Sequence, residues 1–300
     1  MVGFLRYLLL LTAFAVLAAL AGCGSSGGNS QSKQPPPPSS IFAYLHRSGI
    51  PGDYTRYEIM VMQSDGTSMT VAPTAQYDSA VLAPDGQTVL FSFYNPPNYQ
   101  IATIKVDGTG QTVLGNGLYP KYTPDGSKIV YQSGQWLAVM NADGSGATVT
   151  TVGEFCFPAT NGSIIAGSML NGATEGLATV NMDGSNPQII LPSAYFVYPA
   201  FSADGGTVFF GNSNGPDENI YSIGSAGSNL LQLTDSPVNW DPIVTNNKIY
   251  FVAVPSNLQT WTVDSQQIFS MNPDGSDLTQ VTNDTLYDGF QTANGLCLNP

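Results

Sequence analysis

Residues 77–92 read YDSAVLAPDGQTVLFS: an aromatic residue and an aspartate, then a Pro-Asp-Gly turn and a β-rich run. The pattern returns as YPKYTPDGSKIVYQ at 119–132 and YPAFSADGGTVFFG at 198–211, with weaker copies at 155–167, 240–252 and 287–298. The turn residues are spaced 40, 36, 43, 42 and 48 residues apart: Asp85, Asp125, Asn161, Asp204, Asn246 and Asn294. A period of about 42 residues is typical of one four-stranded blade of a β-propeller.

A second series of turns alternates with the first. Five Asp-Gly pairs each follow an apolar run and precede a shorter one, beginning at Asp65, Asp107, Asp143, Asp183 and Asp274, and residues 224–227 fill the missing place in degenerate form. Asp tolerates a tight turn and Gly supplies positive φ, so these pairs predict hairpins. Each unit then has strands a and b around the first turn and strands c and d around the second. Both turn series should lie on one face of the ring, and the b-to-c and d-to-a connections on the other.

The first unit lacks a strand a. Residues 41–45, 57–62 and 69–72 supply strands b, c and d, whereas the last copy, from Tyr287, supplies a strand a with little after it. Pairing these two ends closes a ring and removes exposed sheet edges. We therefore expect residues 41–300 to form an all-β, six-bladed β-propeller of four-stranded blades, closed by pairing the C-terminal strand with the N-terminal blade.

The first 40 residues predict export and anchoring. Residues 1–22 carry Arg6 and then an apolar run that is too short to span a bilayer, as in a secretory signal peptide. Leu20-Ala21-Gly22-Cys23 resembles the bacterial lipobox, which implies lipidation of Cys23, and residues 23–40 form a Gly/Ser/Pro tether. The expected location is the cell envelope, with Cys23 lipid-anchored in a membrane. Gly24 after the cysteine favours an outer membrane, facing the periplasm or the cell surface, over an inner one.

The balance of acidic and basic residues limits which classes of partner the chain can bind. After Cys23 the chain has 21 acidic residues against 7 basic ones, so nucleic acid is a poor partner, because phosphate binding depends on Lys and Arg. Cys156 and Cys297 could pair in an oxidising compartment. A body of about 260 residues needs no covalent staple, however, and buried free thiols are the expectation.

No catalytic residue, metal site or cofactor is expected. The chain has no Gly-x-Ser-x-Gly motif, and His46 is its one histidine, expected in a solvated loop; a catalytic triad or a histidine metal cluster cannot be assembled around it with ordinary partners. The Asp-Gly turns are not EF-hands, because Ile190 and Val281 stand where a liganding Glu is required.

The strings PDGSKIVYQS at 124–133, NMDGSNPQIILP at 181–192 and LLQLTDSPVNWDP at 230–242 resemble the repeats of TolB-like propellers. The resemblance covers residues 41–300 and implies a six-bladed propeller. Propellers of this repeat serve as partner-binding scaffolds and also as domains attached to enzymes, so the resemblance fixes architecture more closely than function.

A working face can be placed by counting blades. The residue after the leading aromatic is an aspartate in blades 2, 6 and 1, which are neighbours in a closed ring: Asp78, Asp241 and Asp288. The longest b-to-c connections lie on the same face and largely in the same blades. They carry residue types enriched at binding hot spots: Tyr54, Arg56, Tyr94, Tyr99 and Trp261.

Two functions stay open. The first is a non-catalytic scaffold that binds a protein partner of basic character, because clustered carboxylates attract positive charge. The alternative is a carbohydrate-binding or carbohydrate-active propeller that uses carboxylates at the channel mouth, since glycan chemistry needs only two acids at a suitable separation.

Overall fold

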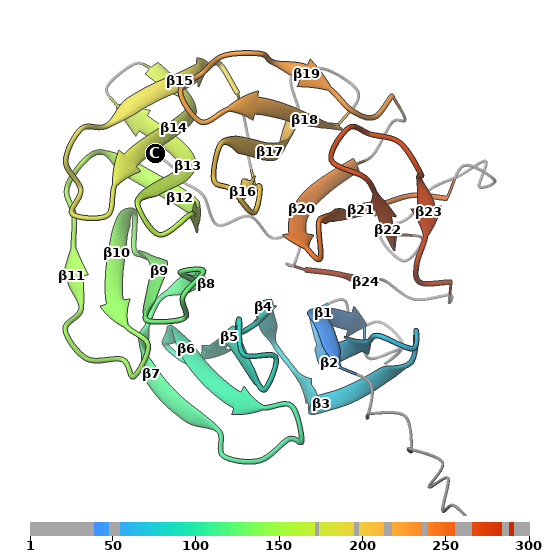
Figure 1. Ribbon diagram of the computed structural model, residues 1–300. Coiled ribbons are helices and arrows are strands. Elements are labelled where there is room, and N and C mark those ends of the chain that lie inside the picture. Colours follow the sequence, from blue (N-terminus) through green and yellow to red (C-terminus); the bar gives the residue numbers. More distant parts are fainter. Residues whose placement is uncertain are drawn as a thin grey trace, which may run out of the picture. The chain divides into compact units, whose positions relative to one another are not determined.

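The computed structural model describes residues 39–47, 55–171, 174–194, 198–212, 218–235, 239–255, 266–283 and 288–290. Residues 1–38, which include Cys23, lie outside these ranges, as do Tyr54, Trp261 and Cys297. Ser39 and Ser40, the last two residues of the predicted tether, lie inside them, and Ser40 already belongs to a strand. Within them the chain forms six antiparallel sheets of four strands each, arranged around a ring (Figure 1). No helix capable of crossing a membrane occurs in the described part of the chain.

Five of the blades follow the order of the chain. Blade 2 contains β4 (Tyr77–Leu82), β5 (Thr88–Asn95), β6 (Asn98–Lys105) and β7 (Thr112–Asn116). Blade 3 contains β8 (Leu118–Tyr122), β9 (Lys128–Ser133), β10 (Trp136–Asn141) and β11 (Thr148–Val149). Blade 4 contains β12 (Glu154–Thr160), β13 (Ile164–Asn171), β14 (Thr174–Asn181) and β15 (Gln188–Pro192). Blade 5 contains β16 (Ala200–Phe201), β17 (Thr207–Asn212), β18 (Asn219–Gly224) and β19 (Leu231–Gln232). Blade 6 contains β20 (Asn239–Thr245), β21 (Lys248–Ala253), β22 (Gln267–Met271) and β23 (Thr279–Gln280).

Blade 1 combines the two ends of the repeat region. β1 (Ser40–Arg47), β2 (Tyr57–Gln63) and β3 (Ser68–Ala75) come from its start, and β24 (Asp288–Gly289) comes from the far end. β24 pairs antiparallel with β1 through Leu45 opposite Gly289 and His46 opposite Asp288. The predicted closure, with the C-terminal strand as strand a of blade 1, is therefore confirmed.

The predicted turns are confirmed by their hydrogen bonds. At Asp143 the carboxylate Oδ1 accepts from the backbone N–H of Ser145 at 2.9 Å and from its hydroxyl at 2.6 Å. Gly144 follows at φ 85°, a left-handed conformation that favours glycine. These hydrogen bonds favour the ionised form and lower the pKa of Asp143. The same bonding recurs at Asp65, Asp107, Asp183 and Asp274.

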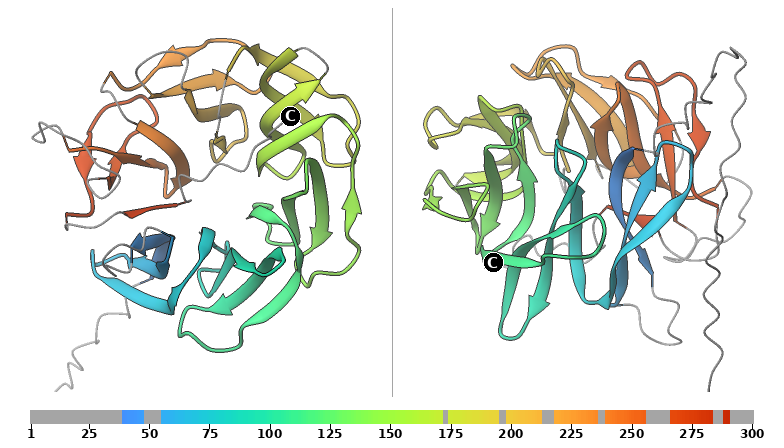
Figure 2. Two further views of the ribbon diagram at one scale, coloured as in Figure 1. Left: turned by 180° about the vertical axis from the view of Figure 1, so that it is seen from behind. Right: turned by 60° about the horizontal axis from the view of Figure 1, so that its bottom comes forward.

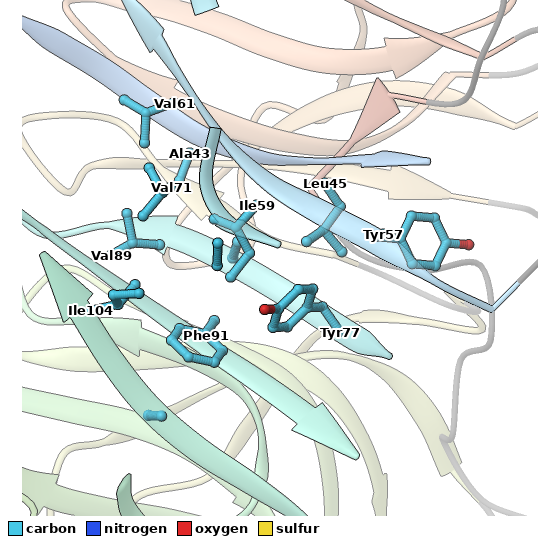
Figure 3. Close-up of a cluster of buried hydrophobic side chains, with 13 residues drawn as sticks. Ala43, Leu45, Tyr57, Ile59, Val61, Val71, Tyr77, Val89, Phe91 and Ile104 are labelled. Carbon is cyan, nitrogen blue, oxygen red and sulfur yellow. The ribbon is translucent and has the colours of Figure 1, made fainter. Parts of the chain in front are cut away.

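The core is divided among the interfaces between consecutive blades. One cluster of 13 buried residues joins blades 1 and 2, with Ile59, Val71 and Val89 near its centre (Figure 3). Successive side chains of a strand point to opposite faces, so neighbouring residues serve neighbouring interfaces. Phe91 packs toward blade 1, whereas Leu90 packs toward blade 3. The interface between blades 6 and 1 contains Phe290, which is fully buried.

The expectation that Cys156 is a free thiol is wrong. This residue is 1% exposed on β12 and is disulfide-bonded. The size of the domain indicates only whether it needs a covalent staple. Whether a disulfide forms depends on the distance between two cysteines in the folded chain, which the sequence does not give.

Candidate binding face of the central channel

Two faces of the ring can be distinguished by backbone hydrogen bonds. On one face, here called the loop face, the b-to-c connection meets the start of strand a: Tyr94 N–H donates to Gln76 O at 2.9 Å. On the other, the turn face, the two turns of a blade meet: Val106 N–H donates to Gln87 O at 2.9 Å. The predicted sorting of turns and connections is confirmed, and Figure 2 shows the ring from behind and from a tilted direction.

Bulges shape the inner strands where they leave the loop face. The register shifts between Leu118 and Lys121 in blade 3, and equivalent shifts occur in blades 4 and 6. The bulged residues Tyr119, Phe157 and Asp241 have φ of 50°, 51° and 55°. Left-handed backbone at non-glycine residues is strained, and bulges of this kind re-aim side chains next to functional sites.

Aromatic side chains from the bulges form an arc. The Tyr119 and Phe157 ring centroids lie 4.7 Å apart, and those of Phe157 and Tyr198 lie 4.1 Å apart. Tyr99 and Tyr198 pack against the same cluster, which therefore contains residues of blades 2, 3, 4 and 5. Four blades come together only around the channel. Burial raises the pKa of the Tyr198 phenol well above its usual value, and the nearby Tyr119 and the carboxyls of Asp241 and Glu218 act in the same direction.

The three predicted aspartates are all buried. Asp78 is 4% exposed on β4, Asp241 is 5% exposed on β20 and Asp288 is 0% exposed on β24. Burial raises the pKa of Tyr99, and the carboxyl of Asp78 adds to that shift; the carboxyl of Asp241 likewise adds to the shift of Tyr198. The blades of Asp78 and Asp241 adjoin the closing segment on its two sides: Ala80 N–H of blade 2 donates to Phe290 O at 3.3 Å, and Asp288 N–H donates to Gln266 O, next to blade 6, at 3.1 Å.

Asp288 has a specific partner that the sequence did not indicate. Its Oδ1 lies 2.7 Å from His46 Nδ1. The expectation that His46 is a solvated loop residue is wrong, because the residue belongs to β1, pairs with Asp288 across the closure and has a side chain that is 21% exposed. This contact ties the closing strand to the first blade.

The predicted aromatic loops are partly visible. Tyr94 and Tyr99 face each other across the β5–β6 hairpin, with ring centroids 5.0 Å apart, and Tyr94 is 37% exposed. Arg56 is exposed just before β2. Tyr54 and Trp261 lie outside the described residues, so their assignment to this face stays a prediction.

Around the loop-face channel, the three predicted aspartates therefore come from blades 6, 1 and 2, and the aromatic cluster extends from Tyr99 of blade 2 to Tyr198 of blade 5. Tyr119, Phe157 and Tyr198 were not among the predicted site residues, because the leading aromatic residue and the aspartate after it were taken as two different positions of the repeat. The bulges place Tyr119, Phe157 and Asp241 in the same structural position. A proline follows each of these three residues in the sequence, and this shared neighbour could have indicated that they are equivalent.

Comparison with known proteins agrees with this architecture. No family model and no curated protein matches the sequence. The crystal structure of TolB from Acinetobacter baumannii has a TM-score of 0.68 at 14% identity, covering 83% of this chain and 65% of that one, so this chain spans less than two thirds of its length. A putative TolB from Agrobacterium tumefaciens has a TM-score of 0.63 at 14% identity, with 85% and 92% covered. A chain in a nidogen/laminin complex has a TM-score of 0.58 at 12% identity, with 82% and 93% covered. This chain has the TolB-like propeller fold.

Proposed function

We propose that this TolB-like propeller is a non-catalytic scaffold of the cell envelope that binds a protein partner of basic character on its loop face. The observation that carries the proposal is the ring of acids and aromatics around the channel at that face. Asp78 and Asp241 supply carboxylates that are 4% and 5% exposed, and Tyr94 and Tyr99 supply partly exposed aromatic surface on the same face. Arg, Lys and aromatic groups of a partner are the natural complement of such a surface.

The electrostatics of the whole chain support this choice of partner. The formal net charge is −13, and carboxylates at a channel mouth focus that field on one place. Fields of this kind act mainly on the association rate and on partner choice, and they weaken with added salt. A positively charged protein segment is therefore the occupant that the loop face favours.

The fold gives general support for a scaffold role. A propeller of the same fold occurs in the nidogen/laminin complex, an assembly of proteins. For this chain we further propose attachment to an envelope membrane by a lipid on Cys23, which would place the loop face where secreted and periplasmic proteins can reach it.

Binding of a labelled octalysine peptide to the full chain in detergent tests the proposal. The parent should bind the peptide, and the affinity should fall steeply between low and physiological salt. The Asp78→Asn/Asp241→Asn variant should bind about tenfold more weakly at low salt, the equivalent of about 1.4 kcal/mol. A pull-down from envelope extract, with parent and variant side by side, should recover a basic protein with the parent only.

A matched control removes the same charge from the turn face. Asp85→Asn/Asp204→Asn changes two exposed acids of the first turns there, and Asn already occupies the same turn position in blades 4 and 6, at Asn161 and Asn246. This control should bind as the parent does. If the loop-face variant is unstable on melting, Tyr94→Ala, which alters an exposed side chain, replaces it. Equal binding by parent and loop-face variants would show that these residues only shape the inner strands.

A further inference from the structure

A second concave site lies at the opposite end of the channel. The turn face holds a cavity of about 690 Å³, walled by the first turns of blades 2 to 6 and by the start of β1. Its size is in the range of small-molecule sites rather than of protein docking surfaces. Consecutive turns touch at its rim: a Cβ on Gly126 would lie 3.8 Å from Pro84, and one on Gly162 would lie 3.6 Å from Pro124.

One long cationic side chain enters an otherwise neutral part of the wall. Lys121, on β8, pairs with Val130 two rungs from the first turn of its blade. Within the described residues, four other blades have a residue at the position equivalent to Lys121. These residues also line the cavity, and all four are apolar: Val81, Ala159, Ala200 and Ile243. The propeller architecture therefore does not require a lysine at this position.

Lys121 is half-buried, and within the described part of the chain its ammonium makes no hydrogen bond or ion pair. Burial lowers its pKa, and the carboxylate of Asp241 opposes that shift only through space. An enclosed ammonium without a partner in contact is costly, because it gives up water and gains only a distant counter-charge, here that of Asp241. The site is thus electrostatically incomplete.

The rest of the wall offers neutral polar groups. Ser163, Asn246 and Asn247 line the cavity with a hydroxyl and two amides. The Asn161 amide also lies there, but it is bonded within the turns: its Oδ1 accepts from Ser163 N–H at 2.9 Å and its Nδ2 donates to Gly205 O at 3.2 Å. Asp204 also lines the rim, but its carboxylate faces its own turn, accepting from the Ser202 hydroxyl at 2.6 Å and from Gly206 N–H at 3.0 Å. The wall therefore combines one cation with several hydroxyl and amide groups.

We propose that the turn-face cavity binds a small organic monocarboxylate with a hydroxylated or amide-bearing body, and that the Lys121 ammonium pairs with its carboxylate. The pair would be a charge-assisted hydrogen bond in an enclosed site. The chain's net charge of −13 disfavours polyanions at long range, so the ligand is a small monoanion that Lys121 recognises at close contact. The cavity lies at the opposite end of the channel from the loop face and does not depend on the proposed partner there. Asp241 of the loop face acts on Lys121 through space, so the test leaves Asp241 unchanged.

Calorimetric titration of the full chain with gluconate tests the proposal, with sorbitol as the neutral counterpart. Gluconate should bind in a saturable way and sorbitol should not. Lys121→Met should weaken gluconate binding at least roughly tenfold, whereas Lys121→Arg, which keeps the charge, should retain it. Lys128→Met removes an equal charge from an exposed position of the same blade and should leave binding unchanged.

Three further readouts keep the outcome decisive. Melting curves establish that the Lys121 variants are folded, and Asp78→Asn should leave gluconate binding intact while the loop face is altered. Lactate and N-acetylglycine extend the probe set to smaller and amide-bearing carboxylates. If none of the three carboxylates binds to the parent, or if Lys121→Met binds gluconate as the parent does, the cavity is not a carboxylate site.

Discussion

Closure of the ring depends on a short strand, and Phe290→Ala tests it most directly. Phe290 follows β24 and is fully buried between blades 6 and 1, with its ring centroid 5.5 Å from that of Phe42. Its backbone carbonyl accepts from Ala80 N–H of blade 2. The residue therefore contacts the blades on both sides of the closure.

The magnitude follows from the burial. Truncating a fully buried Phe to Ala costs about 3–5 kcal/mol through lost apolar burial and the remaining cavity. For a domain of this size, such a loss lowers Tm by about 10 °C. Local opening should accompany the loss, because β24 helps to join the two ends of the repeat region, together with the packing of Phe42 against Tyr250.

Calorimetry and hydrogen exchange together measure this effect. Phe210→Ala is the matched control, since Phe210 is also 0% exposed but lies between blades 4 and 5. Both variants should lose similar Tm, yet only Phe290→Ala should accelerate exchange selectively in β1 and β4. A Tm within about 2 °C of the parent, or exchange in β1 that rises no more than in the control, would refute the role given to β24.

Three other predictions concern the turns and the anchor. Hydrogen bonds from Thr123 and Ser127 lower the pKa of Asp125 to about 2, and because this folded value lies below the unfolded one, the stabilisation is present above pH 4 and lost toward pH 2. The difference in Tm between the parent and Asp125→Ala should therefore disappear as the pH falls over that range, and a constant difference would show that these hydrogen bonds are not the cause. Gly66→Ala should lower the free energy of unfolding by about 1–2 kcal/mol for left-handed backbone alone, whereas Gly184→Ala should lower it more, since its Cβ would lie 2.8 Å from a Thr150 methyl and nothing lies within 4 Å at Gly66. Equal losses of unfolding free energy in urea would argue against the contact with Thr150. Cys23→Ala should release the protein from membranes, and an unmodified cysteine by intact mass in the parent would disprove lipidation.

The sequence alone was enough to predict the blades and their closure. Turn chemistry is local: a Pro-Asp-Gly or Asp-Gly string specifies its hairpin from neighbouring residues, as the Ser145 to Asp143 bonds show. Repeated at a regular period, such turns predict the strand order, and the missing first strand of blade 1 predicts its replacement by the C-terminal one. The predicted acids Asp78, Asp241 and Asp288 also follow from counting blades.

The tertiary structure decided what meets across the channel. The bulges that make Tyr119, Phe157 and Asp241 equivalent depend on how the inner strand pairs with its neighbour. A shift of that register by one residue leaves no clear sign in the amino-acid composition. The contact of His46 with Asp288 joins the two ends of the repeat region, and Lys121 becomes conspicuous only when aligned with the apolar residues of other blades. Local sequence patterns specify each blade, whereas a channel site is assembled from residues far apart in the chain, and only closure of the ring brings them together.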